Sequence, residues 1–381
     1  MEIWQIILLY LIQPVTWLGV ILAGVVYYRR LKQERQLFRI AIDRDFYEGR
    51  HFLKTAVFGL VLGGVISLAA GLMLNNGALL LLELAGVLGL LALPAIDLSL
   101  VFLWLAVLAA CLLNLTGNSL LNMSHHLISV AGKQLPANLL LVLVLFFLLR
   151  TFLLHYKKST WFTPSIQNGK RGRRVAYYKW KEFSVIPLVV LIPADTWQSS
   201  VPYWPIFSFN GHSFGLLILP LFVAATLKVF KKEPQEMLRY YRQQSLWLAA
   251  LSLVAAIGGL FEPLVAIAGL LLVGILAGIF TFKRRRLDAT GQRWYVETKE
   301  GVRVIAVMPD TPAAKMKIKK GDIILDCNNI AVHNEAEFYA ALQKNSAYCH
   351  LRVKTFTGDL KIAESAIYAD APHEIGLILF Q

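Results

Sequence analysis

The sequence predicts a polytopic α-helical membrane domain of about seven to nine spans, followed by a small soluble α+β domain. Hydrophobic residues make up 57% of the 381 residues and charged residues only 16%, a balance outside the range of ordinary soluble domains. Apolar runs of membrane-spanning length continue as far as residue 282; beyond it the runs are short and turn residues are frequent. We therefore expect a membrane domain at 1–282, a basic juxtamembrane linker at 283–291 and a cytoplasmic domain at 292–381.

The net charge of +14 is explained by membrane orientation rather than by nucleic-acid binding, which we do not expect. Only Glu2 lies between the initiator methionine and the first apolar span, at 3–28, whereas Arg29, Arg30 and further basic residues follow it closely. This order is the reverse of that in a cleaved signal peptide. Because cytoplasmic loops carry the excess of Lys and Arg, the N-terminus is expected outside. The basic residues at 283–286 place the C-terminus in the cytoplasm.

The apolar runs after the first span are expected to cross the membrane in alternating directions. Termini on opposite sides require an odd number of crossings, about nine if the short run at 183–193 spans rather than re-enters. Glu83 and Asp97 lie within or beside these runs and are candidate functional residues, because ionisable groups at membrane depth are costly. The other expected spans are 56–74, 78–93, 98–115, 137–155, 214–230, 246–260 and 264–282.

A basic segment with interleaved aromatic residues lies between two of these runs. Its aromatic residues Tyr177, Tyr178 and Trp180 are typical of a membrane interface. Anchoring on the cytoplasmic side explains its charge, and anionic lipid bound at the basic cytoplasmic loops is a second interpretation. Its basic residues are Lys157, Lys158, Lys170, Arg171, Arg173, Arg174, Lys179 and Lys181.

The C-terminal domain opens with a short apolar run at 302–307 and a Pro-Asp-Thr-Pro-Ala-Ala turn at 309–314. Gly321 and Asp322 then precede a second apolar run; the glycine permits a positive φ, and the aspartate can bond nearby backbone. This order of turn, Gly-Asp pair and strand resembles the PDZ family, in its bacterial form. Asn334 is a plausible N-cap for a helix at about 335–344, with Glu337 as its capping-box partner. The buried stripe of that helix would contain Phe338, Ala341 and Leu342.

The PDZ resemblance implies a groove in which a peptide adds as a strand between a sheet edge and a helix. The edge strand is expected at 373–380, an order that resembles a circularly permuted bacterial PDZ domain. Residues 374–377, Glu-Ile-Gly-Leu, would stand at the carboxylate-binding loop, where this chain keeps only the second glycine and adds the charge of Glu374. An internal peptide segment is therefore as good a ligand as a free C-terminus. The expected peptide-binding residues are Glu335, Tyr339, Leu342, Ile375, Gly376, Leu377 and Ile378.

No enzyme is predicted, and we expect no catalytic residue, cofactor or metal. Residues 211–215 match the Gly-x-Ser-x-Gly pattern, but that motif requires a strand before the serine and a helix after it. An aromatic loop precedes it instead, and no histidine occurs between His212 and His333 to act as a base. The chain has no His-Glu-x-x-His motif, its three cysteines lack Cys-x-x-Cys spacing, and the adjacent His125 and His126 lack metal-site spacing.

Two further stretches, at 27–35 and 337–345, together with 374–377, resemble the MinJ family of cell-division topological determinants from Gram-positive, Bacillus-like bacteria. That resemblance implies a non-enzymatic scaffold of the Min system that links the coiled-coil protein DivIVA to the MinD/MinC division-site selection system. It also implies a multi-pass protein of the cell membrane with a cytoplasmic PDZ domain, concentrated at septum and poles. Two alternatives remain open: a PDZ-bearing regulator of an envelope protease, and a transporter whose flux depends on Glu83 or Asp97.

Overall fold

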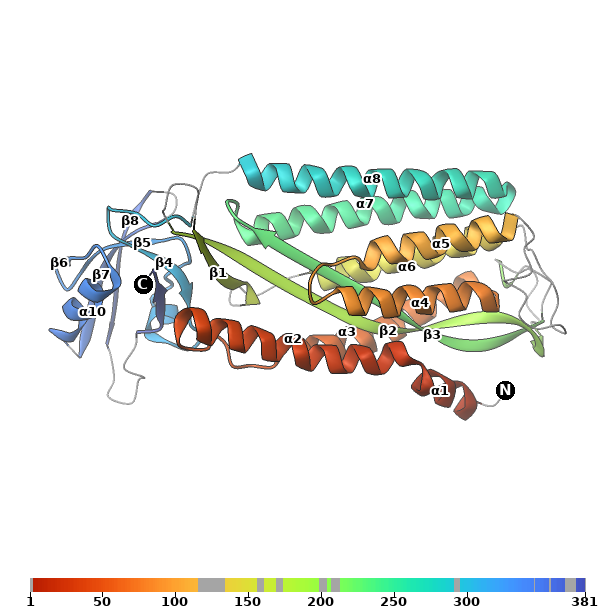
Figure 1. The fold of residues 1–381 in the computed structure, drawn as a ribbon, viewed down its shortest axis with the longest axis horizontal. Coiled ribbons are helices and arrows are strands. Elements are labelled where there is room, and N and C mark those ends of the chain that lie inside the picture. Colours follow the sequence, from red (N-terminus) through yellow and green to blue (C-terminus); the bar gives the residue numbers. More distant parts are fainter. Residues whose placement is uncertain are drawn as a thin grey trace.

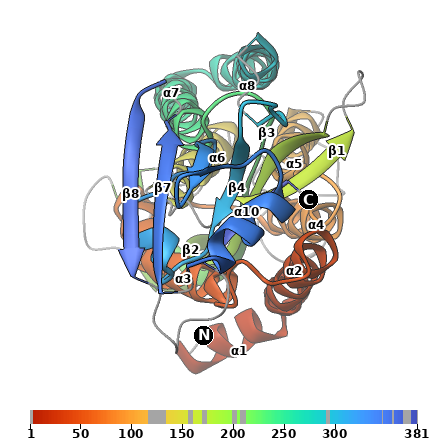
Figure 2. The ribbon, with the colours of Figure 1, turned by 90° about the vertical axis from the view of Figure 1, so that its left-hand side faces the viewer.

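The protein consists of a long membrane part with the C-terminal domain at one end (Figure 1). The computed structural model describes residues 3–115, 134–155, 161–168, 174–198, 204–206, 213–290, 295–345, 347–355, 358–366 and 375–380. The N-terminus lies at the end of the long axis away from the C-terminal domain. Viewed along that axis, the C-terminal domain stands in front of the bundle, with α1 and α2 at its lower edge (Figure 2).

The helices of the membrane part fall into three groups. Four of those described are long and apolar enough to cross a membrane, namely α3, α6, α7 and α8. α1 and α2 form a pair bent by 54°, which would make a fifth span, and α4 and α5 are shorter apolar helices. The helices are α1 (Ile3–Ile12), α2 (Pro14–Phe38), α3 (Tyr47–Ala70), α4 (Asn76–Ala92), α5 (Ser99–Leu115), α6 (Leu135–Leu153), α7 (Pro234–Phe261) and α8 (Pro263–Thr290).

Residues 183–193 and 214–230, expected as membrane spans, are not helical. They belong to a long antiparallel hairpin, β2 (Arg174–Gln198) and β3 (Ser213–Val229), which β1 (Thr163–Asn168) joins in the order β1-β2-β3. The helical prediction was wrong here because both faces of the hairpin are covered. A strand covered on both faces is apolar throughout, and periodicity cannot separate it from a buried helix. The expected sites at Gly211, His212, His125 and His126 lie outside the described residues; Ser213 begins a strand, not a helix.

The hairpin lies inside the helical bundle, where its backbone finds protein partners. The N–H of Leu191 donates to the carbonyl of Leu72 at 2.8 Å, and the N–H of Leu74 donates back to Leu191 at 2.9 Å. The hydroxyl of Ser67 donates to the carbonyl of Val189. The chain after α3 thus pairs with the edge of β2, as a strand at membrane depth requires, because lipid offers no hydrogen bonds.

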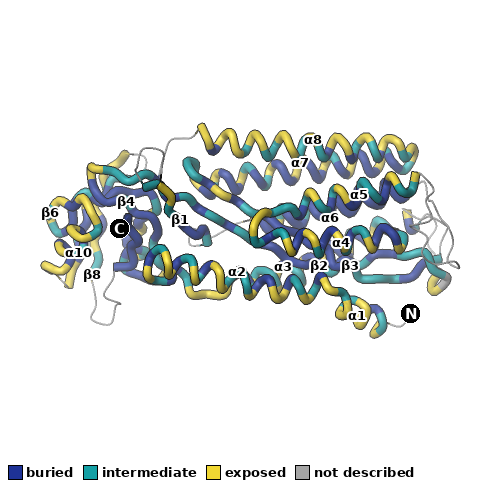
Figure 3. The backbone as a smooth tube through the Cα atoms, viewed as in Figure 1, coloured by how far each residue is buried: buried dark blue, intermediate teal, exposed yellow. Residues whose placement is uncertain are grey.

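Glycines let α3 approach the hairpin closely. A Cβ atom at Gly59 would lie 2.4 Å from Cγ2 of Ile186, and one at Gly63 would lie 3.3 Å from Leu188. α6 is the central helix, with 83% of its most apolar window buried, against 17% for α8 at the periphery. The outer faces of α2 and α8 are exposed along much of their length (Figure 3). Large exposed side chains on α8 are Leu264, Val265, Leu271, Leu272, Ile275, Ile279 and Phe282, an apolar surface suited to lipid.

The C-terminal domain is a sheet of order β8-β7-β5-β4-β9, with β6 paired to β5. Several predicted local features are confirmed: Gly321 has φ of 95°, and the side chain of Asn334 accepts from the N–H of Glu337 at 2.8 Å. Asp322 accepts from the N–H of Lys319 at 2.9 Å. The basic stretch expected as a linker continues helix α8 as far as Thr290. The elements are β4 (Val302–Val307), α9 (Pro312–Lys315), β5 (Ile323–Cys327), β6 (Ile330–Ala331), α10 (Glu335–Gln343), β7 (Tyr348–Lys354), β8 (Leu360–Ala366) and β9 (Leu377–Leu379).

Candidate functional site

The expected groove residues gather around one core cluster of the C-terminal domain. Leu342 on α10 and Leu377 on β9 are both buried in it, and Ile375 joins them. Tyr339 packs against the same cluster while partly exposed, and Glu335 is partly exposed one turn earlier on α10. Among the described strands β9 is the end strand of its sheet. An end strand presents a row of backbone N–H and C=O groups to which a peptide can pair.

Gly376 fixes the chain where it enters β9. It has φ of 87°, and a Cβ atom there would lie 2.2 Å from Oγ1 of Thr311, so a larger residue fits neither the conformation nor the space. Its carbonyl accepts from the N–H of Met308 at 2.8 Å, and that of Ile375 accepts from Ala313 at 3.0 Å. Glu374 lies outside the described residues.

One expected groove residue, Ile378, has its side chain on the other face of β9. Its neighbours Leu377 and Leu379 belong to the core of the C-terminal domain, whereas Ile378 and Phe380 belong to a cluster shared with the hairpin. Alternate side chains of a strand point to opposite faces, which explains the separation. The prediction that the Ile378 side chain lines the groove was therefore wrong.

The shared cluster docks the C-terminal domain on the base of the hairpin. Tyr178 of β2 donates from its hydroxyl to the carbonyl of Ile305 on β4, and its ring lies 4.5 Å from that of Tyr295, nearly perpendicular to it. The backbones also pair: Ala176 N–H donates to Tyr295 at 2.9 Å, and Glu297 N–H donates to the carbonyl of Arg174 at 3.3 Å. Because side chains and backbone both cross it, this is a packed joint and not a loose tether.

Lys320 inserts into the same joint from the turn before β5. Its Nζ lies 4.6 Å from the ring centroid of Phe162 and 4.6 Å from that of Tyr178. Burial lowers the pKa of Lys320 to about 7, and the nearby Glu233 acts in the opposite direction. The two ring faces also favour the charged ammonium. The joint therefore contains a lysine whose charge is costly and only partly compensated.

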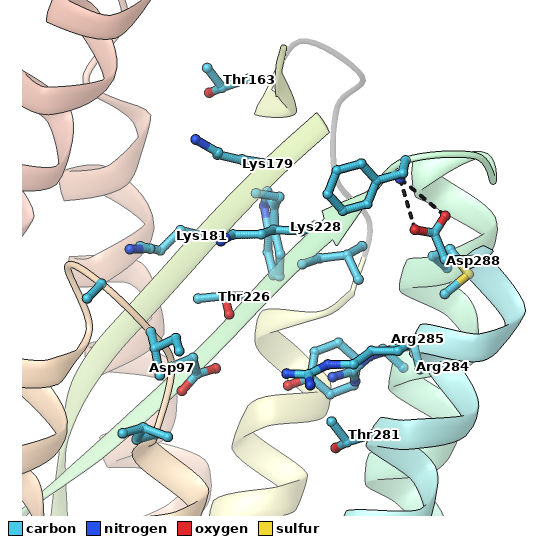
Figure 4. A pocket seen from close by; sticks show the side chains of 18 of the residues that line it. Asp97, Thr163, Lys179, Lys181, Thr226, Lys228, Thr281, Arg284, Arg285 and Asp288 are labelled. Carbon is cyan, nitrogen blue, oxygen red and sulfur yellow. Dashed lines mark hydrogen bonds between the residues drawn. The ribbon is translucent and has the colours of Figure 1, made fainter. Parts of the chain in front are cut away.

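A basic cleft of about 1180 Å³ opens on the other face of β2, at the end of the bundle nearest the C-terminal domain (Figure 4). Lys179 and Lys181 of β2 and Lys228 of β3 line it, and Arg284 and Arg285 of α8 face them. The sequence interpretation singled out Lys179 and Lys181 but missed Lys228. No local signal marks Lys228, because it lies in an apolar run and reaches the cleft only through hairpin pairing.

Asp97 lies at the floor of this cleft and has a structural part. Its Oδ1 accepts from the N–H and the hydroxyl of Ser99 at 3.1 and 2.7 Å, which caps the start of α5. Its Oδ2 lies 3.4 Å from Nη2 of Arg150, and both side chains are buried. Lys181 donates to the carbonyls of Leu93 and Pro94 at 2.6 and 3.2 Å in the turn before it. Glu83 lies elsewhere on α4, partly exposed.

Comparison with known proteins identifies the family. A family described as PDZ domain matches residues 287–355, which confirms the PDZ resemblance but ends before β8 and β9. A protein of Lacticaseibacillus paracasei named "Probable cell division topological determinant MinJ" is 30% identical over 259 residues, 65% of this chain and 67% of that protein. The chain belongs to the MinJ family. A second member, "Cell division topological determinant MinJ" of Bacillus subtilis (strain 168), is 29% identical over 218 residues, 57% of this chain and 54% of that protein. The predicted MinJ resemblance is thereby confirmed.

Proposed function

We propose that this protein is a non-enzymatic membrane scaffold for cell-division site selection, and that it recruits partners through its PDZ domain. The observation that carries the proposal is a PDZ-family domain whose sheet ends in β9 beside α10, on a bundle of apolar helices, in a chain of the MinJ family. The names of its relatives describe them as topological determinants of cell division.

The placement of charge supports a multi-pass topology with the PDZ domain in the cytoplasm. Arg29 and Arg30 near the end of α2, Lys231 before α7 and the basic residues 283–286 of α8 lie toward the C-terminal domain (Figure 1). The N-terminus lies at the opposite end, with no basic residue before α1. The excess of Lys and Arg on cytoplasmic sides orients the protein with its N-terminus outside.

The groove is proposed to form in the permuted manner, with β9 as the edge strand supplied by the C-terminal end of the domain. A peptide would add along β9 opposite α10, in contact with Glu335, Tyr339 and Leu342. Ile375, Gly376 and Leu377 would form the closed end of the groove. The negative charge of Glu374 favours an internal peptide segment over a free carboxylate.

The partners proposed for this groove and its surroundings are a DivIVA-like protein and a MinD-like ATPase, so that the scaffold links pole and septum recognition to the MinD/MinC system. Anchoring in the membrane raises the effective concentration of a partner that is held at the same membrane. A groove contact of modest affinity is then sufficient, and the packed joint at Tyr178 adds a fixed orientation.

The test is localisation of the full-length protein in dividing cells. Glu335→Lys combined with Tyr339→Ala changes the groove face of α10, whereas Ala340→Lys changes an exposed position on the opposite face of the same helix. We expect septal and polar foci for the natural protein and for Ala340→Lys, and dispersed fluorescence for the groove variant. Uniform membrane fluorescence of the natural protein would overturn the scaffold proposal, and unchanged foci of the groove variant would overturn the groove.

A further inference from the structure

The basic cleft contains more positive charge than its own acidic residues neutralise. Nine Lys and Arg side chains line it, against three of Asp and Glu. Of the three acids, Glu48 is bound by Arg30 at 2.6 Å, and Asp288 accepts from the backbone N–H groups of Phe230 and Lys231 at 3.0 Å. Asp97 is shared between Arg150 and the cap of α5. The acids are thus engaged, and a net positive charge faces the cavity.

The hairpin register concentrates this charge on one face. Lys179 of β2 lies directly opposite Lys228 of β3, and Lys181 lies opposite Thr226, so three ammonium groups and a hydroxyl share that face. Like charges directly opposite each other destabilise an antiparallel pair. The arrangement is therefore unfavourable unless an anion lies between them. Figure 4 shows these side chains directed into the same space as Arg284 and Arg285.

A buried guanidinium also has unused donor capacity in the cleft wall. Arg150 is 5% exposed, and its Nε makes no hydrogen bond to any described residue. Its Nη2 contact with Asp97 is long, at 3.4 Å. Buried charged donors normally have partners, so this position points to a ligand that supplies an acceptor.

The deep side of the cleft is apolar and reaches the lipid-facing surface. Leu100 and Val101 of α5 and Ala277 and Phe280 of α8 line it below the charged groups. Val101 is 47% exposed, which opens this side to the outside of the bundle. A site with cations toward the cytoplasmic domain and apolar walls toward the bilayer matches an amphiphile whose head is an anion. Its volume exceeds that of ordinary small-molecule pockets, about 300–1,000 Å³.

We propose that the cleft binds the phosphate headgroup of an anionic phospholipid of the inner leaflet, with an acyl chain against α5 and α8. Lys179, Lys228 and Arg285 contact the phosphate, and Lys181 and Arg284 complete the cationic wall. This site lies on the face of β2 opposite the joint with the PDZ domain and does not depend on the proposed groove. It narrows the general charge attraction of the basic loops to one place.

The experiment measures thermal stabilisation of the detergent-purified full-length protein by added phosphatidylglycerol. Lys228→Gln with Arg285→Gln removes two charges from the cleft. The matched control, Lys283→Gln with Arg286→Gln, removes two exposed charges of α8 that do not line it. We expect the cleft variant to bind about ten- to thirtyfold more weakly, because each basic residue near an anionic surface contributes about fivefold. The control should bind within about twofold of the natural protein, since surface charges act weakly.

Each of the other outcomes contradicts the proposal in a different way. Equal weakening in both double variants would reduce the effect to the charge of α8 as a whole. Equal stabilisation by phosphatidylcholine would remove the need for an anionic headgroup. Stabilisation by inorganic phosphate or glycerol 3-phosphate at the same concentration would assign the cleft to a soluble anion. If the double variant is not monodisperse, Lys228→Gln alone, at an exposed position, serves the same comparison, and unchanged binding by it would overturn the site.

Discussion

The two sheets of this protein differ in what surrounds them. The PDZ sheet has one face on α10 and its own core, and the opposite face of β4 and β9 on the hairpin; its outer strand β8 alternates between buried Ala363 and exposed neighbours. The β2–β3 hairpin is enclosed by helices along most of its length, and β3 is buried almost continuously from Leu219 to Ala225. A sheet at the water surface keeps its two-residue periodicity, whereas a sheet enclosed by apolar helices loses it.

The largest expected effect comes from separating the hairpin from its helices. Gly59→Leu on α3 places a side chain where even a Cβ would lie 2.4 Å from Ile186, and overpacking of this kind costs about 1–3 kcal/mol or more. We expect a strong loss of folded protein, measured as yield and thermal midpoint in detergent. The matched change Gly24→Leu on α2, where nothing lies within 4 Å, should be nearly neutral. If both substitutions behave alike, the hairpin is not packed against α3 as described.

The corresponding test in the PDZ sheet is Gly376→Ala. Its positive φ and the contact with Thr311 should together destabilise the entry to β9 by about 1–3 kcal/mol. Gly358→Ala shares a positive φ, 93°, but meets no neighbour within 4 Å, so it isolates backbone strain. Hydrogen exchange of β9 and β4 in the full-length protein should accelerate more for Gly376→Ala. Equal acceleration in the two variants would mean that the Thr311 contact contributes nothing.

Local chemistry accounts for what could be predicted. The Asn334 cap, the Gly321 turn and the buried Phe338 each depend on residues within a few positions, and all three are present. The hairpin could not be found in this way, because Lys179 and Lys228 are brought together by pairing across 49 positions of sequence. The joint depends on Tyr178 meeting Ile305, a contact between residues 127 apart. Apolar residues that pack in a joint and those that form a core look alike in the sequence, which is why Ile378 was misplaced.

The joint between the two sheets can be weakened without disturbing either. Tyr178→Phe keeps the ring against Tyr295 and removes the hydroxyl that donates to Ile305, leaving a buried carbonyl without this donor. The expected cost is about 1 kcal/mol, or roughly fivefold in the docking equilibrium. Energy transfer between dyes placed by Arg239→Cys and Glu364→Cys reports docking. Tyr177→Phe, on the opposite face of β2, is the control and should leave the transfer unchanged.

The smallest expected effect is a pH dependence of the same joint. The pKa of Lys320 is lowered to about 7 from its ordinary 10.5 when the domain is docked, so the undocked state binds more protons between these values. Docking should therefore strengthen as pH rises above about 7, by at most about tenfold per pH unit, and change little below it. The aromatic rings around Nζ reduce this slope. Lys320→Met removes the titrating group and should give energy transfer that is flat over this range; an equal slope in that variant would assign it to another group.

The length of β2 has a consequence for any partner of the PDZ domain. The strand runs as one element from Arg174, beside the C-terminal domain, to Gln198 toward the far end of the bundle (Figure 1). The standoff of the PDZ domain from the bilayer is then set by a stiff ruler embedded in the protein, not by a flexible leash. A second protein held at the same membrane has to offer its recognition segment at that height, so stature as well as sequence would select which membrane-bound proteins can engage.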